Sequence, residues 1–174
     1  MDIQNINAFR MNNLDESLSE VLGILIRESD ELWKCLAYNE KDALSKSITL
    51  SQKADLCNQD SDSKRLILKP FSSGDIITDE QVQVRMFQDN MRGFSATTGS
   101  IIFTFEIIVH NNLWLLSNQK VRPLIIIREL FNSLSERRLD TMIGQLSFEG
   151  EQLIKRHFNN DYIGYSFSLN IYSG

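Results

Sequence analysis

Hydrophobic positions in the first part of the chain recur every three or four residues, the spacing that lines one side of a helix. Between residues 13 and 36 these positions are Leu14, Leu18, Val21, Leu22, Leu25, Ile26, Leu32, Trp33 and Leu36. Asn13 is placed to cap the helix, and Asp15 and Glu16 lie in its first turn, where the helix dipole favours negative charge. The pattern predicts one amphipathic helix over residues 13–36, buried along its apolar stripe.

The helical pattern fades between Ala37 and Lys64, where Asn, Asp, Ser, Lys and Gln predominate. The sequence NQDSDSK at residues 58–64 is the most linker-like stretch of the chain. We therefore expect a long exposed loop over residues 37–64. Two interpretations remain open, a contact arm that orders against a partner and a connection without a role of its own.

Alternation of apolar and polar residues with a period of two predicts strands in the rest of the chain. The expected strands cover residues 65–71 and 81–87, separated by a Ser-Ser-Gly-Asp turn, then residues 100–110 and 162–172. One face of the strand at 100–110 is wholly apolar and the other is mixed, which predicts a central strand with a partly covered second face. The segment between residues 143 and 158 is expected to add a hairpin around Glu149 and Gly150.

A second helix is predicted from Arg122 to Arg138, with Pro123 in its first turn, where a missing N–H group costs nothing. Ile125 and Ile126 widen its apolar stripe, which predicts that the helix lies between the sheet and a second surface, for which another subunit is a candidate. The elements together predict a single α+β domain over residues 1–174. It would contain an N-terminal tail (residues 1–12), the amphipathic helix, the exposed arm (residues 37–64) and a mostly antiparallel sheet with the second helix packed on it.

The composition of the chain disfavours several classes of function. The chain has 174 residues, a net charge of −5 and a pI near 5.1, which disfavours a role that depends on neutralising many phosphates. Cys35 and Cys57 are too few for a disulfide framework, so we expect reduced thiols. The sequence shows no secretory signal and no apolar stretch of membrane-spanning length. We therefore expect a protein made and folded in the cytosol.

Candidate chemistry is sparse, because the chain has only two histidines. Glu106 and His110 resemble a metal-binding pair, but four residues along a strand separate them by about 13 Å, too far to share one ion. Common nucleophile and phosphate-loop motifs are absent, and no cofactor is expected. A small metal-dependent enzyme or nuclease that uses Asp79, Glu80, Glu106 and His110 remains an alternative.

Several segments taken in order carry a family resemblance. They are LWKCLAYNEKDALSK at 32–46, KPF at 69–71, FEIIVHNNLW at 105–114, VRPLIIIREL at 121–130, IGQLSF at 143–148 and FNNDYIGYSFSL at 158–169. In this succession the chain resembles the small neck and tail-completion proteins of tailed bacteriophages, which include head-to-tail connectors and tail terminators.

That resemblance implies a non-enzymatic structural protein of the virion neck or tail, made in the host cytoplasm and assembled as a homo-oligomeric ring. Its partners would be further copies of itself, a portal or connector protein, and a tail or tail-tube protein. Genomic DNA would pass through the ring without sequence-specific binding, and no membrane would be involved. A regulatory protein-binding module that acts as a monomer or dimer is a second alternative.

Contacts in such a ring are expected from the arm, from aromatic residues beside turns, and from the second helix. The predicted contact residues are Tyr38, Leu44, Ile48, Leu50, Trp114, Arg122, Ile125, Ile126 and Tyr162.

Overall fold

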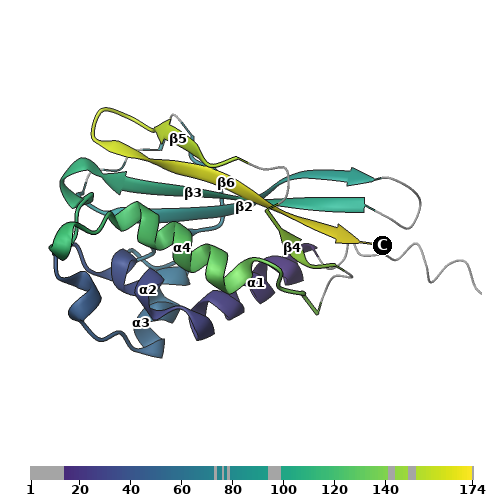
Figure 1. Cartoon of the computed structure of the whole chain (residues 1–174), viewed down its shortest axis with the longest axis horizontal. Helices are drawn as coiled ribbons and strands as arrows, with labels where there is room; N and C mark the ends of the chain where they lie inside the picture. The colour runs from purple at the N-terminus through teal and green to yellow at the C-terminus, as the bar shows by residue number, and fades with distance from the viewer. Residues whose placement is uncertain are drawn as a thin grey trace, which may run out of the picture.

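The computed structural model describes residues 14–72, 74, 75, 77, 79–93, 99–140, 144–148 and 152–173. Its helices are α1 (Leu14–Glu28), α2 (Asp30–Ala37), α3 (Leu50–Cys57) and α4 (Arg122–Leu134), with short 3-10 turns η2 (Ala43–Ser45), η3 (Asn111–Leu113) and η4 (Ser117–Gln119). Its strands are β1 (Leu66–Ile67), β2 (Val82–Gly93), β3 (Gly99–His110), β4 (Leu146–Ser147), β5 (Ile154–His157) and β6 (Tyr162–Ser173) (Figure 1). The predicted α+β class is confirmed. The predicted tail, the Asn13 cap and the Glu149–Gly150 turn lie outside the described residues.

The strands form one mixed, mostly antiparallel sheet in the order β1-β2-β3-β6-β4, with β5 also paired to β6. The strand β3 lies between β2 and β6, and its register with β6 runs without interruption from Gly99 opposite Ser173 to His110 opposite Tyr162. The β2–β3 register shifts between Gln88 and Asn90. Both β4 and β5 pair with β6 and not with each other, so the predicted hairpin between residues 143 and 158 is wrong.

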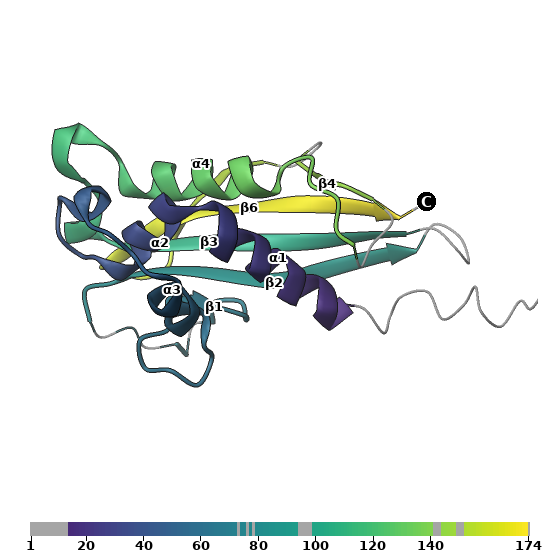
Figure 2. The ribbon, with the colours of Figure 1, turned by 90° about the horizontal axis from the view of Figure 1, so that it is seen from below.

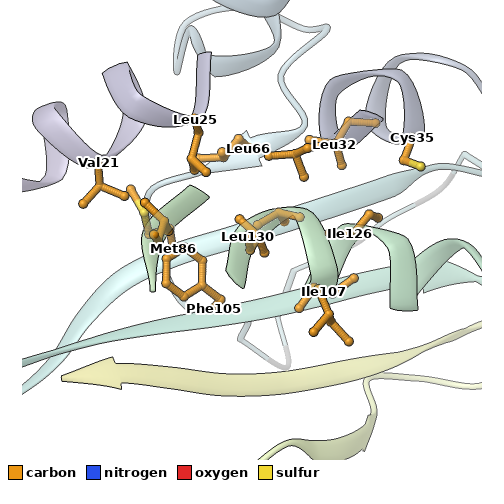
Figure 3. Packing of buried hydrophobic residues seen from close by; sticks show 14 of the residues in the cluster. Val21, Leu25, Leu32, Cys35, Leu66, Met86, Phe105, Ile107, Ile126 and Leu130 are labelled. Carbon is orange, nitrogen blue, oxygen red and sulfur yellow. The ribbon is translucent and has the colours of Figure 1, made fainter. Parts of the chain in front are cut away.

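The helices cover one face of the sheet (Figure 2). Alternate β3 residues, including Phe105 and Ile107, point into this layer, as their period-two spacing predicted. Figure 3 shows them packed with side chains from α1, α2, α4, β1 and β2. Full burial of one such side chain contributes about 1.5–3 kcal/mol relative to exposure, so this layer is the main source of stability.

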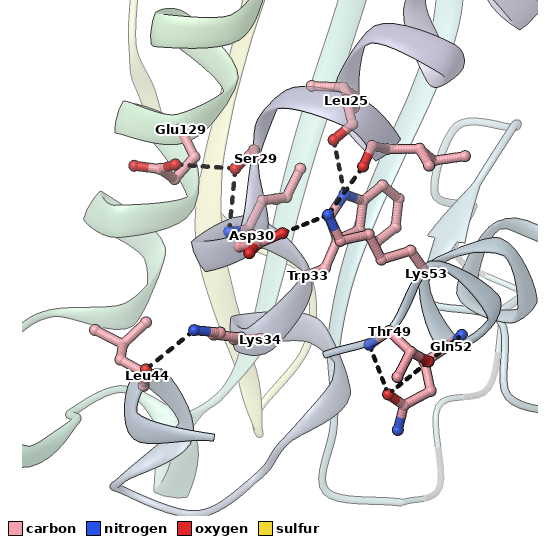
Figure 4. A network of polar contacts seen from close by, with 12 residues as sticks. Leu25, Ser29, Asp30, Trp33, Lys34, Leu44, Thr49, Gln52, Lys53 and Glu129 are labelled. Atoms are coloured by element: carbon pink, nitrogen blue, oxygen red, sulfur yellow. Dashed lines mark hydrogen bonds and ion pairs between the residues drawn. The ribbon is translucent and has the colours of Figure 1, made fainter. Parts of the chain in front are cut away.

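The predicted helix over residues 13–36 is in fact two helices, α1 and α2, which meet at Ser29. Ser29 has an extended backbone, and its Oγ accepts a hydrogen bond from Leu32 N at 3.3 Å, which makes it the N-cap of α2. The same hydroxyl donates to Glu129 of α4 at 2.9 Å (Figure 4). Trp33 Nε1 donates to the carbonyl oxygen of Leu25 at 2.8 Å, which satisfies a group at the end of α1. The single-helix prediction failed because this internal cap ends the first helix.

Residues 37–64 are mostly exposed, as expected, but they are not a bare loop. They contain η2 and the helix α3, which starts with a capping box between Thr49 and Gln52. Lys53 of α3 is buried, and its ammonium group donates to Asp30 Oδ1 and to Ile26 O (Figure 4). This contact fixes α3 to the α1–α2 pair. The role of the segment as a contact arm stays a prediction.

Arg122, at the start of α4, is fully buried. Its guanidinium group donates five hydrogen bonds, all to backbone carbonyl oxygens. The acceptors are Leu113 at 2.9 Å, Cys35 at 2.9 Å, Tyr38 at 2.6 Å, Asn39 at 3.1 Å and Glu40 at 2.9 Å. Four of these carbonyls belong to the end of α2 and the residues after it, where the helix dipole is negative. Burial lowers the pKa of this guanidinium group, and all five of its N–H groups donate hydrogen bonds.

Gly164 of β6 lies where β3 and β6 approach most closely. A Cβ atom at this position would overlap the carbonyl oxygen of Ile107 and would lie 2.8 Å from the carbonyl carbon of the same residue. Both atoms are backbone of the central strand, so they cannot move without disturbing the ladder. The close approach therefore requires glycine.

Within the described residues, no helix is long and apolar enough to cross a membrane.

Replacing Arg122 is expected to remove a large part of the stability of the fold. Arg122→Met leaves five carbonyl oxygens without their donor, three of them from exposed or partly exposed residues that can gain water, so we expect a loss of about 3–5 kcal/mol. Urea unfolding measures this loss. Arg128→Met, which removes an exposed guanidinium group of the same helix, is the control and should cost about 1 kcal/mol or less. Equal losses for the two variants would contradict the importance given to the Arg122 bonds.

Two glycine-to-alanine changes should act in opposite directions. Gly164→Ala forces a methyl group onto the backbone of β3 and should destabilise the protein by about 3 kcal/mol or prevent folding. Gly23→Ala, inside α1, meets only the flexible end of Arg27 at 3.2 Å and should be neutral or stabilising by up to about 1 kcal/mol. Thermal unfolding of the two variants measures the difference, and a tolerated Gly164→Ala would disprove the close approach.

Candidate functional site

Five of the predicted contact residues retain exposed surface. Leu50, at the start of α3, is 67% exposed. Tyr38, Leu44, Ile48 and Trp114 are half-buried and pack against the edge of the core. These residues are accessible to a partner, so their assignment as contact residues stays a prediction.

The other four predicted contact residues are buried inside the chain, and the prediction that they form a surface is wrong. Ile125 and Ile126 pack within α4's contact with α1, α2 and β3, so the second surface beside α4 comes from the same chain. Arg122 holds the end of α2. Tyr162 is 2% exposed, donates its hydroxyl to Asp79 O, and contacts the ring of His110 edge-on. Burial raises the pKa of this phenol.

Three of the four residues of the enzyme alternative, Asp79, Glu80 and His110, lie around Asn112 and Tyr162, whereas Glu106 is bound elsewhere. Glu106 accepts a hydrogen bond from Phe71 N at 2.8 Å, and His110 Nδ1 accepts one from Asn112 N at 3.2 Å. Glu80 accepts from Asn112 Nδ2 at 2.7 Å. Within the described part of the chain, no three His, Cys, Asp or Glu residues are grouped closely enough to hold a metal ion. These side chains hold turns and strand ends in place.

The face of the sheet that the helices leave open is partly covered, as predicted, by the segment before β2. Arg85 of β2 is 3% exposed, and its Nη1 donates to Asp75 Oδ2 at 2.5 Å and to Pro70 O at 3.1 Å. Its guanidinium group also lies over the ring of Phe71, 4.9 Å from the centroid. Asp75 is held in addition by Lys69 at 2.9 Å, and these partners lower the pKa of its carboxyl to about 2. The contacts fix this segment onto the sheet.

A shallow polar depression of about 360 Å³ lies on the same open face, beside the shift in the β2 register. Thr104 and Ser168 share a hydrogen bond of 2.8 Å, and Thr104 also donates to Asp89 at 3.5 Å. Neither hydroxyl has a histidine or lysine partner among the hydrogen bonds of the described residues. The acid beside Thr104, Asp89, lies at the limit of hydrogen-bond distance, and the shorter bond joins the two hydroxyl groups to each other.

Both thiols are protonated at neutral pH. Cys35 and Cys57 are free, and burial raises the pKa of each to about 12. A thiol with such a pKa is a poor nucleophile.

A second hollow, a pocket of about 490 Å³, lies between the η3 turn and strand β5. Lys41 and Lys155 line it, so we call it the Lys41–Lys155 pocket. Its apolar lining comes from Trp114, Leu115 and Ile163, and Asn111 and Asn112 complete it. Sequence analysis identified Trp114 as a contact residue, and it did not connect Lys155 with the residues around Trp114. It missed Lys41, which only the folded chain brings near Lys155.

Large apolar side chains are exposed at several places. Leu115 is 51% exposed beside the Lys41–Lys155 pocket, and Leu124 is 46% exposed at the start of α4. Leu153 and Ile154, at the start of β5, are 41% and 47% exposed. The sequence predicted none of these exposed side chains. Periodicity shows which side of an element an apolar residue lies on, but it does not show whether the core extends far enough to cover that residue.

The stability of the open-face cover should depend on acidic pH. The carboxyl of Asp75 titrates near pH 2 in the folded chain against an ordinary value of 3.8, so its charge stabilises the fold above about pH 4 and that contribution disappears as the pH falls toward 2. We expect a contribution of about 1–2 kcal/mol, measured by urea unfolding between pH 6 and pH 2. Asp75→Asn should be less stable than wild type at pH 6 and nearly equal to it at pH 2. The exposed Asp42→Asn is the control, and a gap for Asp75→Asn that does not close at low pH would contradict the assignment.

Comparison with known proteins places the chain in a family. No curated protein matches it. The model of the YomW family matches residues 29–171, which include α2, α3, α4 and all of the sheet except the last two residues of β6. The match starts at Ser29, the cap that separates α1 from α2. Because it covers most of the chain, the protein belongs to the YomW family.

Proposed function

We propose that this protein is a structural subunit of a tailed-bacteriophage particle, which joins head to tail or completes the tail as one member of a homo-oligomeric ring. Its partners in this role are neighbouring copies, a portal or connector protein, and a tail or tail-tube protein. Genomic DNA passes through the ring without sequence-specific contacts.

The open edge at β5 is the observation that carries this proposal. All four residues of β5 are exposed, and the strand pairs only with β6 among the described strands. Leu153 and Ile154 expose much of their apolar surface there. An exposed edge strand offers unpaired backbone groups to another chain, and exposed apolar side chains beside it favour such a contact, so the β5 edge is a candidate site of association.

A structural role also agrees with how the polar groups are used. Arg122, Arg85 and Glu106 are buried and bound to groups of the same chain. Glu106 is bound away from Asp79, Glu80 and His110, and among the described residues no three acid, histidine or cysteine side chains are grouped to hold a metal ion, which weakens the support for a metal-dependent enzyme. The acidic balance of the chain favours a channel wall that does not retain DNA.

The mass in solution tests the proposal. The full chain is measured by light scattering over a range of concentrations, alone and with purified candidate portal and tail-tube proteins. A closed multimer, or a stoichiometric complex that forms only with one of these proteins, supports the proposal. A monomer or dimer that ignores both proteins overturns it and favours the regulatory module, and tight specific metal binding by that monomer favours the enzyme.

A single charge at the open edge should weaken the assembly. Ile154→Glu places a carboxylate on exposed apolar surface, so the fold should be unchanged and association should weaken by at least about tenfold. Light scattering measures the assembly, and thermal unfolding checks the fold. Asn132→Glu adds the same charge at an exposed position of α4 and serves as the control. Unchanged association of Ile154→Glu would exclude the β5 edge as the contact.

A further inference from the structure

The Lys41–Lys155 pocket presents hydrogen-bond donors without acidic partners. Lys41 and Lys155 are exposed, and within the described residues neither ammonium group lies in an ion pair. Two nearby carboxylates are already engaged, since Glu40 pairs with Lys46 at 2.7 Å and Glu80 accepts from Asn112. With the half-exposed Leu115 beside it, the pocket suits a carboxylate-bearing segment that also covers apolar surface.

An acidic turn of matching chemistry lies at the other edge of the sheet. Residues 58–62 follow α3, and the turn places Asp60 and Asp62 in solvent without an ion pair among the described residues. Its backbone is held by hydrogen bonds from Asp60 N to Asn58 Oδ1 at 3.1 Å and from Ser61 N to Asn58 O at 3.0 Å. The two carboxylates are therefore presented by an ordered turn, which lowers the entropy cost of binding.

The turn is also tied to the edge strand β1. Gln59 Nε2 donates to Leu66 O at 3.0 Å, and Leu68 N donates to Gln59 Oε1 at 3.1 Å. The nearest cation, Lys64, has its ammonium group bound to Gln59 O at 2.8 Å. The position of the acidic turn relative to the sheet is thus fixed by the Gln59 side chain.

The acidic turn and Lys155 lie at the two ends of one row of paired residues across the sheet. In this row Leu66 of β1 pairs with Val84, Val84 with Ile107, Ile107 with Tyr165, and Tyr165 with Lys155 of β5. Four strand spacings of about 4.8 Å put its ends about 19 Å apart. A second copy displaced sideways along this row would place its β1 edge, which carries the acidic turn, beside the β5 edge of the first copy, which carries Lys155.

We propose that the acidic turn at residues 58–62 of one copy binds in the Lys41–Lys155 pocket of the next copy. This inference rests on the proposed ring and names the contact that builds it. Because the two surfaces differ and lie on opposite edges of the sheet, the contact is heterologous and repeats from copy to copy until the ring closes. Arg156, exposed in β5 next to Lys155, adds positive charge at the same edge.

Two complementary variants test the contact. The pocket variant carries Lys41→Glu and Lys155→Glu and keeps the native turn, whereas the turn variant carries Asp60→Asn and Asp62→Asn and keeps the native pocket. Each should fail to assemble alone, with association weakened at least about tenfold. Mixed together, they should form a 1:1 dimer and nothing larger, because only one of the two possible contacts remains. Since the contact is between exposed charges, the dimer should weaken as salt is raised.

A matched variant controls for net charge. Arg27→Glu with Arg138→Glu reverses two exposed cations outside the pocket and should assemble like wild type. All masses are measured by light scattering, alone and with the portal protein, and thermal unfolding confirms that each variant is folded.

The outcomes separate the inference from the proposed function. Unchanged multimers in the pocket and turn variants overturn the inference and leave the ring intact. A wild-type chain that stays monomeric in all conditions, with no dimer in the mixture, overturns both. Assembly lost in each variant and a dimer restored by mixing supports the contact.

Discussion

The fold depends on the buried guanidinium group of Arg122. α4 and the end of α2 are more than 80 residues apart in the chain, and this one side chain donates to carbonyls of both the α2 end and the η3 turn. A carboxylate would neutralise the charge of Arg122 more strongly than these carbonyl groups do. Carbonyl groups at a helix C-terminus partly neutralise the charge and also fix the backbone conformation, because the five N–H groups of the rigid guanidinium fork can be satisfied by only one arrangement of the backbone. The bend after α2 and the start of α4 are thereby set relative to each other. The apolar layer between them then packs in one way.

The sequence predicted the parts of the fold whose signals are local. The strand β6 alternates apolar and polar residues, β3 keeps one wholly apolar face, and α4 has both a proline start and a strong apolar stripe, so each was found close to its observed bounds. The separation of α1 from α2 also had a local signal, because Ser29 is followed by Asp30 and Glu31, a typical helix start that the continuous apolar spacing obscured. Thr49 and Gln52 gave a similar signal for α3 within a polar segment.

Other features had no local signal. The parallel pairing of β1 with β2 and the pairing of both β4 and β5 with β6 depend on which strands meet in space, and a short strand carries too few residues to indicate its partner. Arg122 was expected at the surface because arginine is seldom fully buried. The Lys41–Lys155 pocket joins two residues more than 100 positions apart. The pocket depends on the register with which β5 pairs with β6, and this register cannot be predicted from the spacing of residues along the chain.

The order of the strands has a consequence for biosynthesis. The strand β3 reaches its full set of hydrogen bonds only when β6, about 60 residues later in the chain, pairs with it along twelve positions. While the intervening residues are synthesised, the edge of β3 that later pairs with β6 has no partner strand. At that stage α1, α2, β2 and β3 can already have formed. Pairing over such a separation is slow, and an apolar strand with an open side is prone to bind other nascent chains. A cell that makes this protein in large amounts must therefore protect the unfinished sheet, by rapid completion of the chain or by a chaperone, until β6 arrives.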